Sequence, residues 1–233
     1  MNVPQPERRL KRFYGDVARL QNSDIIKLIT GRRVLDIGCG YGSLIDQIRR
    51  EKGDIEITGI DIDPESIRMA KKLYGIDVRN MSVCKLEFPD DSFDTVILRE
   101  AIHHIAADAS FELALKEIRR VCRKELIIFD PNPNWILRFS RKLIKHVDPE
   151  APLDKVVDVL EANGFNVREC RLRDVIAFPL SGGFVGSELV PNIKPVKKAV
   201  IATDKLLNNV IRKLRLQKHF CWRYLIYAVK QGR

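Results

Sequence analysis

Three glycines follow a short apolar run in the segment from Val34 to Leu44, which reads VLDIGCGYGSL. The run Val34–Ile37 has the composition of a buried strand, and a helical pattern opens at Ser43. Glycine lets the backbone approach a ligand closely, and the first turn of a helix offers unpaired N–H groups to an anionic group. The segment therefore predicts a loop for a nucleotide-type cofactor. A GxGxxG dinucleotide loop would need a third glycine where Ser43 stands, which disfavours a nicotinamide cofactor.

An acidic residue ends the next β-rich run. Asp61 follows the stretch Ile55–Ile60, about 20 residues beyond the loop, where a carboxylate can accept hydrogen bonds from both hydroxyls of a ribose. Asp63 precedes Pro64, and this is the pattern of a helix cap with proline in the first turn. We therefore expect Asp61 to bind a ligand and Asp63 to have a structural role.

Two adjacent histidines, His103 and His104, follow a further β-rich run, Asp94–Arg99. Open α/β sheets bind ligands at the edge formed by the carboxyl ends of their strands. Imidazole accepts a proton near neutral pH, so either histidine could act as a general base toward an acceptor or orient it. Packing or capping of the following helix is the alternative. Arg99, on the same rim, could hold an anionic acceptor or form a surface ion pair.

The cysteines give no sign of a metal centre or a disulfide framework. They form no CxxC pair, and none has a histidine at metal-ligand spacing, so we expect no metal site and reduced, mostly buried thiols. The five are Cys39, Cys84, Cys122, Cys170 and Cys221.

The elements that must position these residues alternate between β-rich and amphipathic stretches from Arg33 to Asp130. Such alternation predicts βαβ units and a parallel sheet. A helical pattern precedes the sheet from Glu7 to about Thr30, and Gly31 is expected to end that helix. The later stretches are two helices, Trp135–Val147 and Leu153–Asn163, a strand, Asn166–Leu172, and a last aromatic strand, Cys221–Lys230.

The chain of 233 residues is 45% hydrophobic and 31% charged, the composition of a folded protein. Its length suits one α/β domain, residues 1–233, with an amino-terminal helical segment, residues 1–30. The long excursion between residues 174 and 220 is predicted to be a lid that recognises the substrate.

Three segments, VLDIGCGYG, ITGIDIDPESI and LEFPDDSFDTVIL, resemble in order and spacing three motifs of class I S-adenosylmethionine (SAM)-dependent methyltransferases. The resemblance covers roughly Arg33 to Asp130 and is strongest to the broad UbiE-like, or type 11, group. It implies a Rossmann-like, doubly wound α/β sheet of seven strands with the last strand antiparallel. It also implies SAM as cofactor and S-adenosylhomocysteine as product.

The same resemblance assigns roles to the glycine-rich loop. Asp36 would orient the methionine end of the cofactor through its ammonium group. Gly38 and Gly40 would line the path of the cofactor along the backbone, and Cys39 between them would fill space under the loop. Gly42 would either form a tight turn alone or also contact the cofactor.

The resemblance places the nucleoside end of the cofactor further along the chain. Asp61 would hold the ribose and Ile62 would pack against the adenine. Ser82 stands where the family usually has an acidic residue that accepts the adenine amino group, and a hydroxyl accepts this bond more weakly than a carboxylate. Val83 and Leu98 complete the implied cofactor contacts.

A formal charge of +10 and a pI near 9.5 indicate an anionic partner or simply a solvated basic surface. Basic residues interrupt an apolar face in Trp135–Val147 and again in Val196–Arg215. These two faces could meet an anionic membrane, steer a lipid-linked acceptor, cover the core or form a lid. Nucleic acid is disfavoured, because no RNA-binding motif is present and LREA stands where amino-directed methyltransferases carry NPPY.

These features predict methyl transfer by in-line attack onto the oxygen, carbon or sulfur of a small or lipid-linked acceptor. An RNA-directed methyltransferase and a SAM-binding protein without turnover remain alternatives. The amino-terminal residues lack the apolar stretch of a secretory signal. The sequence therefore predicts a cytoplasmic protein, with peripheral membrane contact left open.

Overall fold

The computed structural model describes residues 12–106, 110–145 and 147–232, so residues 7–11 of the predicted first helix lie outside it. Contacts divide the chain into two compact units. The sheet unit comprises Ile25–Pro131, Asp148–Arg171 and the described part of Tyr224–Arg233. The helical unit comprises the described parts of Met1–Asp24, Asn132–Val147 and Leu172–Arg223. The single domain and the lid predicted from the sequence stay predictions.

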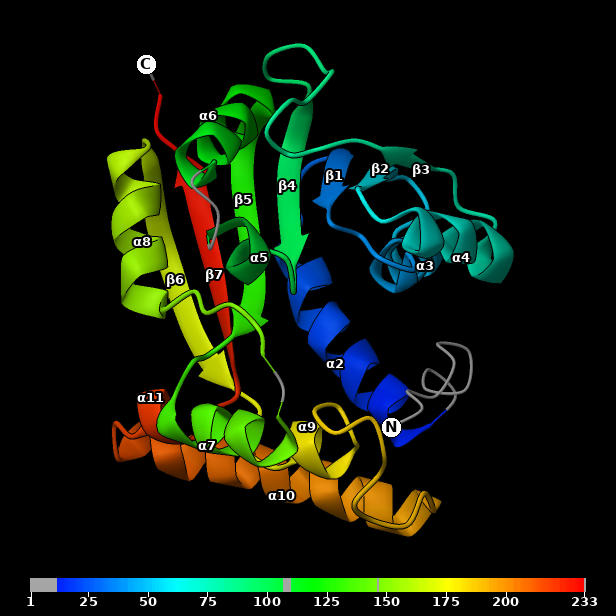
Figure 1. The fold of residues 1–233 in the computed structure, drawn as a ribbon, viewed down its shortest axis with the longest axis vertical. Coiled ribbons are helices and arrows are strands. Elements are labelled where there is room, and N and C mark those ends of the chain that lie inside the picture. The colour runs from blue at the N-terminus through cyan, green and yellow to red at the C-terminus, as the bar shows by residue number, and fades with distance from the viewer. Residues whose placement is uncertain (1–11, 107–109, 146, 233) are drawn as a thin grey trace. The chain divides into compact units, whose positions relative to one another are not determined.

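Seven strands form one sheet in the order β3-β2-β1-β4-β5-β7-β6. The pairs β1–β2, β1–β4, β2–β3 and β4–β5 are parallel, whereas the last strand, β7, is antiparallel (Figure 1). This confirms the predicted Rossmann-like, doubly wound sheet. The strands are β1 (Arg33–Ile37), β2 (Glu56–Asp61), β3 (Val78–Asn80), β4 (Phe93–Arg99), β5 (Cys122–Pro131), β6 (Phe165–Arg173) and β7 (Arg223–Lys230).

Helices connect the strands where the sequence predicted them, and the described residues also form short helices that were not predicted, one at the two histidines and two in the excursion between residues 174 and 220. Asp63 caps α4 by accepting hydrogen bonds from the backbone N–H groups of Glu65 and Ser66, which confirms its structural role. The helices are α2 (Phe13–Leu28), α3 (Ser43–Glu51), α4 (Pro64–Tyr74), α5 (Ile102–Ala106), α6 (Phe111–Val121), α7 (Trp135–Ile144), α8 (Leu153–Ala162), α9 (Ala177–Leu180), α10 (Lys194–Lys213) and α11 (Gln217–Phe220).

The core of the sheet unit lies where α2 and α3 pack against the central strands. Ile127 and Phe129 of β5 belong to this buried cluster, together with Ile25 of α2 and Ile48 of α3. Because side chains alternate along a strand, Asp130 belongs to the opposite face, which carries α5. The alternation of β5 thus separates an apolar packing face from a face that contributes a carboxylate.

Gly31 does not end the first helix as predicted, because α2 already ends at Leu28. The glycine is needed for close packing instead: a Cβ atom at position 31 would lie 2.1 Å from the Cβ atom of Asp94. Asp94 also accepts hydrogen bonds from the backbone N–H groups of Arg32 and Arg33. The close packing of Gly31 against Asp94 and these hydrogen bonds therefore fix the start of β1 against β4.

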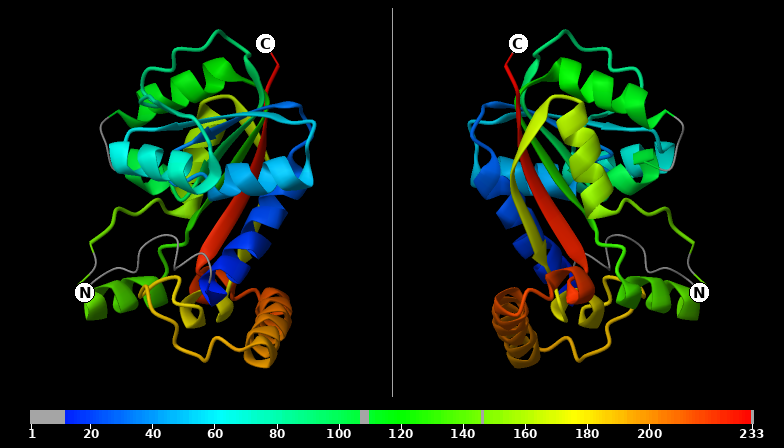
Figure 2. Two further views of the ribbon diagram at one scale, coloured as in Figure 1. Left: turned by 90° about the vertical axis from the view of Figure 1, so that its right-hand side faces the viewer. Right: turned by 90° about the vertical axis from the view of Figure 1, so that its left-hand side faces the viewer.

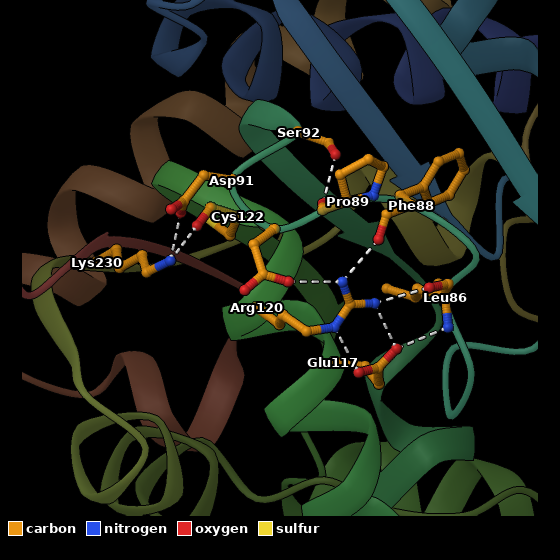
Figure 3. A network of polar contacts seen from close by, with 10 residues as sticks. Leu86, Phe88, Pro89, Asp91, Ser92, Glu117, Arg120, Cys122 and Lys230 are labelled. Carbon is orange, nitrogen blue, oxygen red and sulfur yellow. Dashed lines mark hydrogen bonds and ion pairs between the residues drawn. The ribbon is translucent and has the colours of Figure 1, made fainter.

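Arg120 of α6 holds the LEFPDD segment that precedes β4 (Figure 3). Its guanidinium donates to the backbone carbonyls of Leu86 and Phe88, at 2.7 and 2.6 Å. Glu117, one turn earlier, accepts from the N–H of Leu86 at 2.8 Å and also pairs with Arg120. The segment Leu86–Asp91 thus forms a strap between β3 and β4, which Arg120 and Glu117 hold in place.

The helical unit has its own apolar cluster, which includes Phe13 of α2, Leu137 of α7 and Phe178 of α9. The buried carboxylate of Asp204, from α10, accepts hydrogen bonds from the backbone N–H groups just before and at the start of α9. Figures 1 and 2 show α10 as one long helix, and α9 and α11 both contact it.

All five cysteines are free thiols, but only Cys122 and Cys221 are buried, so the expectation of mostly buried thiols is wrong. Among the described residues, no helix has both the length and the apolar character needed to cross a lipid bilayer.

Candidate functional site

A cavity of about 540 Å³ opens in the sheet unit at the carboxyl ends of β1 and β2. Strand β1 has β2 on one side and β4 on the other, so the order of the strands reverses here, which is where open α/β sheets bind ligands. The lining residues are Ile37, Gly38, Gly40, Ile60, Asp61, Ile62, Asp63, Met81, Ser82, Val83, Cys84, Glu100, Ala101, His104, Ile105 and Ser110.

The glycine-rich loop after β1 adopts a backbone that favours glycine. Gly38 and Gly40 have φ angles of +67° and +53°, in the left-handed region. The N–H of Gly38 donates to the carbonyl of Ile60 at 2.9 Å, and the N–H of Gly40 donates to Asp61 Oδ2 at 2.8 Å. These bonds hold the loop against the end of β2, and both glycines line the cavity.

Asp36, in β1, is a buried carboxylate whose two oxygens have no hydrogen-bond partner. Burial raises its pKa to about 7; the charge of Arg99 opposes the shift and that of Asp61 adds to it. A buried carboxylate without a donor is costly, so such a group indicates a missing cationic or hydrogen-bonding ligand. The sequence predicted an ammonium group as the partner of this residue.

Asp61 and Ile62 present a carboxylate and an exposed apolar side chain to the cavity. Asp61 Oδ1 accepts from the N–H of Asp63 at 2.9 Å, and Oδ2 accepts from Gly40, so each oxygen keeps acceptor capacity. Ile62 is 70% exposed although it is a large apolar residue. The pair therefore offers acceptors for hydroxyl groups beside a surface for a flat ring.

Ser82 and Val83 lie on the loop after β3, and both line the cavity, so their predicted contact with the adenine end stays a prediction. Ser82 Oγ accepts from the N–H of Cys84 at 3.2 Å, which fixes the turn. Leu98 and Cys39 do not belong to the lining, and neither does Asp36, although its neighbour Ile37 does. Leu98 is fully buried in β4, and Cys39 lies under the loop, where burial raises the pKa of its thiol. Contacts of these two residues with a cofactor stay predictions.

His103 and His104 have different surroundings. His104 is exposed and lines the cavity, whereas His103 is buried and its Nδ1 lies 2.9 Å from both carboxylate oxygens of Asp130. Their rings are 4.1 Å apart. Burial disfavours the charged form of His103, but Asp130, Asp148 and Glu100 outweigh it and raise the pKa. His104, next to the cavity, thus lies beside a second histidine, His103, whose ring is oriented by Asp130.

Three acidic residues at this edge were missed as site residues by the sequence analysis. Asp130 is the last acid of β5, Asp148 follows 18 residues later, and Glu100 lines the cavity with a φ of +56°. A positive φ at a residue other than glycine marks strain that often accompanies function. Asp130 at the end of β5 and Glu100 directly after β4 could have been noticed from their places at strand ends, whereas Asp148 is distant in sequence from both histidines.

Comparisons with known proteins agree with this geometry. Residues 34–125, which include β1 with its glycine-rich loop, β2, β3 and β4, match a family model described as a methyltransferase domain. Over 157 residues, 60% of this chain and 67% of the relative, the sequence is 31% identical to an O-methyltransferase of Aspergillus nomiae. The chain belongs to the SAM-dependent methyltransferases.

Other members of this family show a similar degree of relationship. An O-methyltransferase of Aspergillus sclerotiorum is 32% identical over 177 residues, which are 69% of this chain and 62% of the relative. A phthiotriol/phenolphthiotriol dimycocerosates methyltransferase of Mycobacterium ulcerans is 32% identical over 160 residues, 64% of this chain and 58% of the relative. The chain thus spans 58% to 67% of the length of these three relatives.

The fold itself occurs in a SAM-dependent methyltransferase from Archaeoglobus fulgidus of known crystal structure. The two structures superpose with a TM-score of 0.66 at 22% identity, over 92% of this chain and 94% of the other. This likeness concerns the arrangement of strands and helices.

The residues of the cavity fit S-adenosylmethionine, the cofactor of this methyltransferase family. The unpartnered carboxylate of Asp36 suits the ammonium of the methionine end. Asp61 has acceptor capacity for ribose hydroxyls, and Ile62 offers an apolar surface to adenine. Ser82 has a hydroxyl but no carboxylate for the adenine amino group.

Proposed function

We propose that this methyltransferase transfers the methyl group of SAM to an oxygen of a small or lipid-linked acceptor. The observation that carries the proposal is the unpartnered carboxylate of Asp36 beside a cavity that also presents Asp61 and His104. The relatives named as O-methyltransferases support oxygen as the acceptor atom, and the relative named for phthiotriol dimycocerosates supports a lipid-linked acceptor. Carbon and sulfur remain the alternative acceptor atoms.

When bound, SAM supplies an electrophilic methyl group, so the protein must mainly position the acceptor and exclude water. Asp36 and Asp61 fix the two ends of the cofactor. At the cavity edge, His104 accepts the proton of the acceptor hydroxyl or orients this hydroxyl, and His103, held by Asp130, supports His104 from the buried side. If alanine variants of both histidines keep wild-type turnover, this assignment is wrong.

Transfer of a labelled methyl group into fractionated cell extract tests the proposal. We expect the label in an organic-soluble or small-molecule fraction, and we expect Asp61→Asn to reduce labelling because the amide binds ribose hydroxyls less well. Asp158→Asn makes the same chemical change at an exposed position of α8 and serves as the matched control.

Two results would contradict the proposal. Label in RNA would support an RNA-directed methyltransferase, and tight, salt-sensitive retention of RNA during purification would agree with it. Binding of S-adenosylhomocysteine without label in any fraction would support a SAM-binding protein without turnover.

The helical unit supports contact with an anionic membrane surface as a further part of this proposal. In α7, the apolar side chains of Trp135, Phe139 and Leu143 recur every four residues and are exposed, with Arg138 and Lys142 between them. These side chains do not cover the core, which was the alternative considered from the sequence. An exposed apolar stripe flanked by basic residues is typical of helices that lie in a membrane interface.

Helix α10 repeats this pattern in the same unit. Leu206 and Val210 are exposed, and Leu214 directly after the helix is exposed as well. The acidic residue of α10 is Asp204, whose side chain is buried, so the exposed charges of this helix are all basic. Charge complementarity therefore favours anionic headgroups over an uncharged or acidic partner.

Flotation with vesicles tests the membrane contact. We expect binding to vesicles that contain phosphatidylserine, weaker binding at high salt, and loss of binding in the double variant Phe139→Ala/Lys142→Ala. Leu113→Ala/Lys116→Ala is the control, because these exposed α6 residues have the same spacing in the sheet unit. Equal binding of both variants, or none by the wild type at low salt, would contradict the contact.

A further inference from the structure

Three potential metal ligands converge at the edge of the cofactor cavity. His103 Nε2 lies 3.6 Å and His104 Nε2 lies 4.0 Å from Asp148 Oδ1, and one ligand atom from each residue lies within 4.8 Å of the other two. Ligands of one ion with bonds of about 2.0–2.2 Å are about 3–3.6 Å apart in tetrahedral or octahedral geometry. Small side-chain rotations would therefore bring all three onto a single ion.

Asp130 gives His103 the support that metal-bound histidines usually have. Its carboxylate lies 2.9 Å from Nδ1 of His103, and both side chains are buried. A carboxylate behind one ring nitrogen keeps a proton there and leaves the lone pair on the other nitrogen. The free lone pair is then on Nε2, the atom closest to Asp148.

The charges around His103 also favour a cation. Asp130, Asp148 and Glu100 all act electrostatically on its ring from different segments of the sheet unit. Three carboxylates around His103 and its neighbour His104 are suited to a bound metal ion. A bound ion would also have His104, which is exposed at the cavity, as a ligand.

We propose that His103, His104 and Asp148 bind one divalent transition-metal ion. Two imidazole nitrogens and one carboxylate suit Zn²⁺, Mn²⁺ or Fe²⁺, whereas Mg²⁺ and Ca²⁺ prefer sites built from oxygen ligands. Three protein ligands leave a position open for an oxygen of the acceptor, which loses its proton more easily on a metal. With the ion bound, the metal and not His104 would contact the acceptor, and His104 would act as a ligand of the ion. This role rests on the proposed function, whereas ion binding itself does not.

Calorimetric titration of the purified chain with ZnCl₂, and separately with MgCl₂, tests the site. We expect one Zn²⁺ per chain and no comparable binding of Mg²⁺. Asp148→Asn and His104→Ala should lose this binding, and Asp130→Asn should weaken it by about 10- to 100-fold. His219→Ala removes an exposed histidine of α11 and should leave it unchanged. Wild-type affinity for S-adenosylhomocysteine in Asp148→Asn would show that this variant is folded.

The proposal is overturned if the wild type binds no Zn²⁺, or if Asp148→Asn binds it as the wild type does. The second result would mean that other groups, such as the exposed thiol of Cys170, hold the ion. Methyl transfer without Zn²⁺ binding would disprove the metal site alone, and Zn²⁺ binding without methyl transfer would disprove the proposed function alone.

Discussion

Asp204 of the helical unit and Asp36 of the sheet unit are both buried, and the two aspartates differ in their partners. In the helical unit, Asp204 Oδ1 accepts from the N–H groups of Val175, Ile176 and Ala177 at 2.7–2.9 Å. In the sheet unit, neither oxygen of Asp36 has a partner. Burial raises the pKa of both carboxyls, so burial and a shifted pKa alone do not identify a ligand site. The missing partner distinguishes the binding residue from the structural one.

The largest effect expected from this difference is on folding. Asp204→Ala would leave three backbone donors without their acceptor, so we expect it to lower the free energy of unfolding by about 3–5 kcal/mol. Denaturation by urea measures this loss. Asp204→Asn, which keeps an acceptor oxygen, should lose less. A change in affinity for S-adenosylhomocysteine without loss of stability would contradict the structural role of Asp204.

The same kind of substitution at Asp36 should have the opposite pattern. Asp36→Asn removes an unpaired buried charge, so the free chain should be at least as stable as the wild type. Affinity for S-adenosylhomocysteine should fall about 10- to 150-fold, because a charge-assisted bond to an ammonium contributes about 1.5–3 kcal/mol. Calorimetry measures the affinity, and Asp158→Asn provides the exposed control. Unchanged affinity would show that Asp36 does not contact the ammonium group.

The raised pKa of Asp36 also predicts a pH dependence. Because its folded-state pKa is about 7, against 3.8 for an ordinary aspartate, its contribution to the stability of the free chain is complete below about pH 4 and is lost as the pH rises through 7. Cofactor binding should weaken up to tenfold per unit below pH 7, because the ammonium group must displace a proton. Arg99 and Asp61 are the charges that act on Asp36. Comparing wild type with Asp36→Asn isolates the effect, and parallel pH profiles would contradict it.

The sequence predicted the sheet unit better than the helical unit for a physical reason. Strands buried on both faces, and glycines that need a left-handed backbone, leave strong local patterns, so β1, its loop and Asp61 could be found. The exposed stripe of α7 has the same periodicity as a buried one, so sequence could not tell which face α7 presents to solvent.

The acidic residues around His103 were missed for a different reason. Asp130 and Asp148 belong to the site because the chain brings a strand end and a later loop next to α5. No local period connects residues so far apart in sequence. The loop, the ribose acid and the histidines were therefore predictable, whereas the groups that orient the histidines required the fold.

The smallest effect is expected for Arg120. A variant of this residue tests the difference between residues that bind the cofactor and residues that hold the cofactor-binding loops in place. Arg120→Lys keeps the charge but cannot donate to Leu86, Phe88 and Glu117 together, so we expect a loss of about 1–2 kcal/mol. Thermal denaturation should show a decrease in melting temperature of about 2–8 °C. Arg68→Lys, at an exposed ion pair, should change it little. Because Ser82 lies only four residues before this strap, affinity for S-adenosylhomocysteine should fall slightly. A fall as large as that of Asp36→Asn would place Arg120 in the binding site instead.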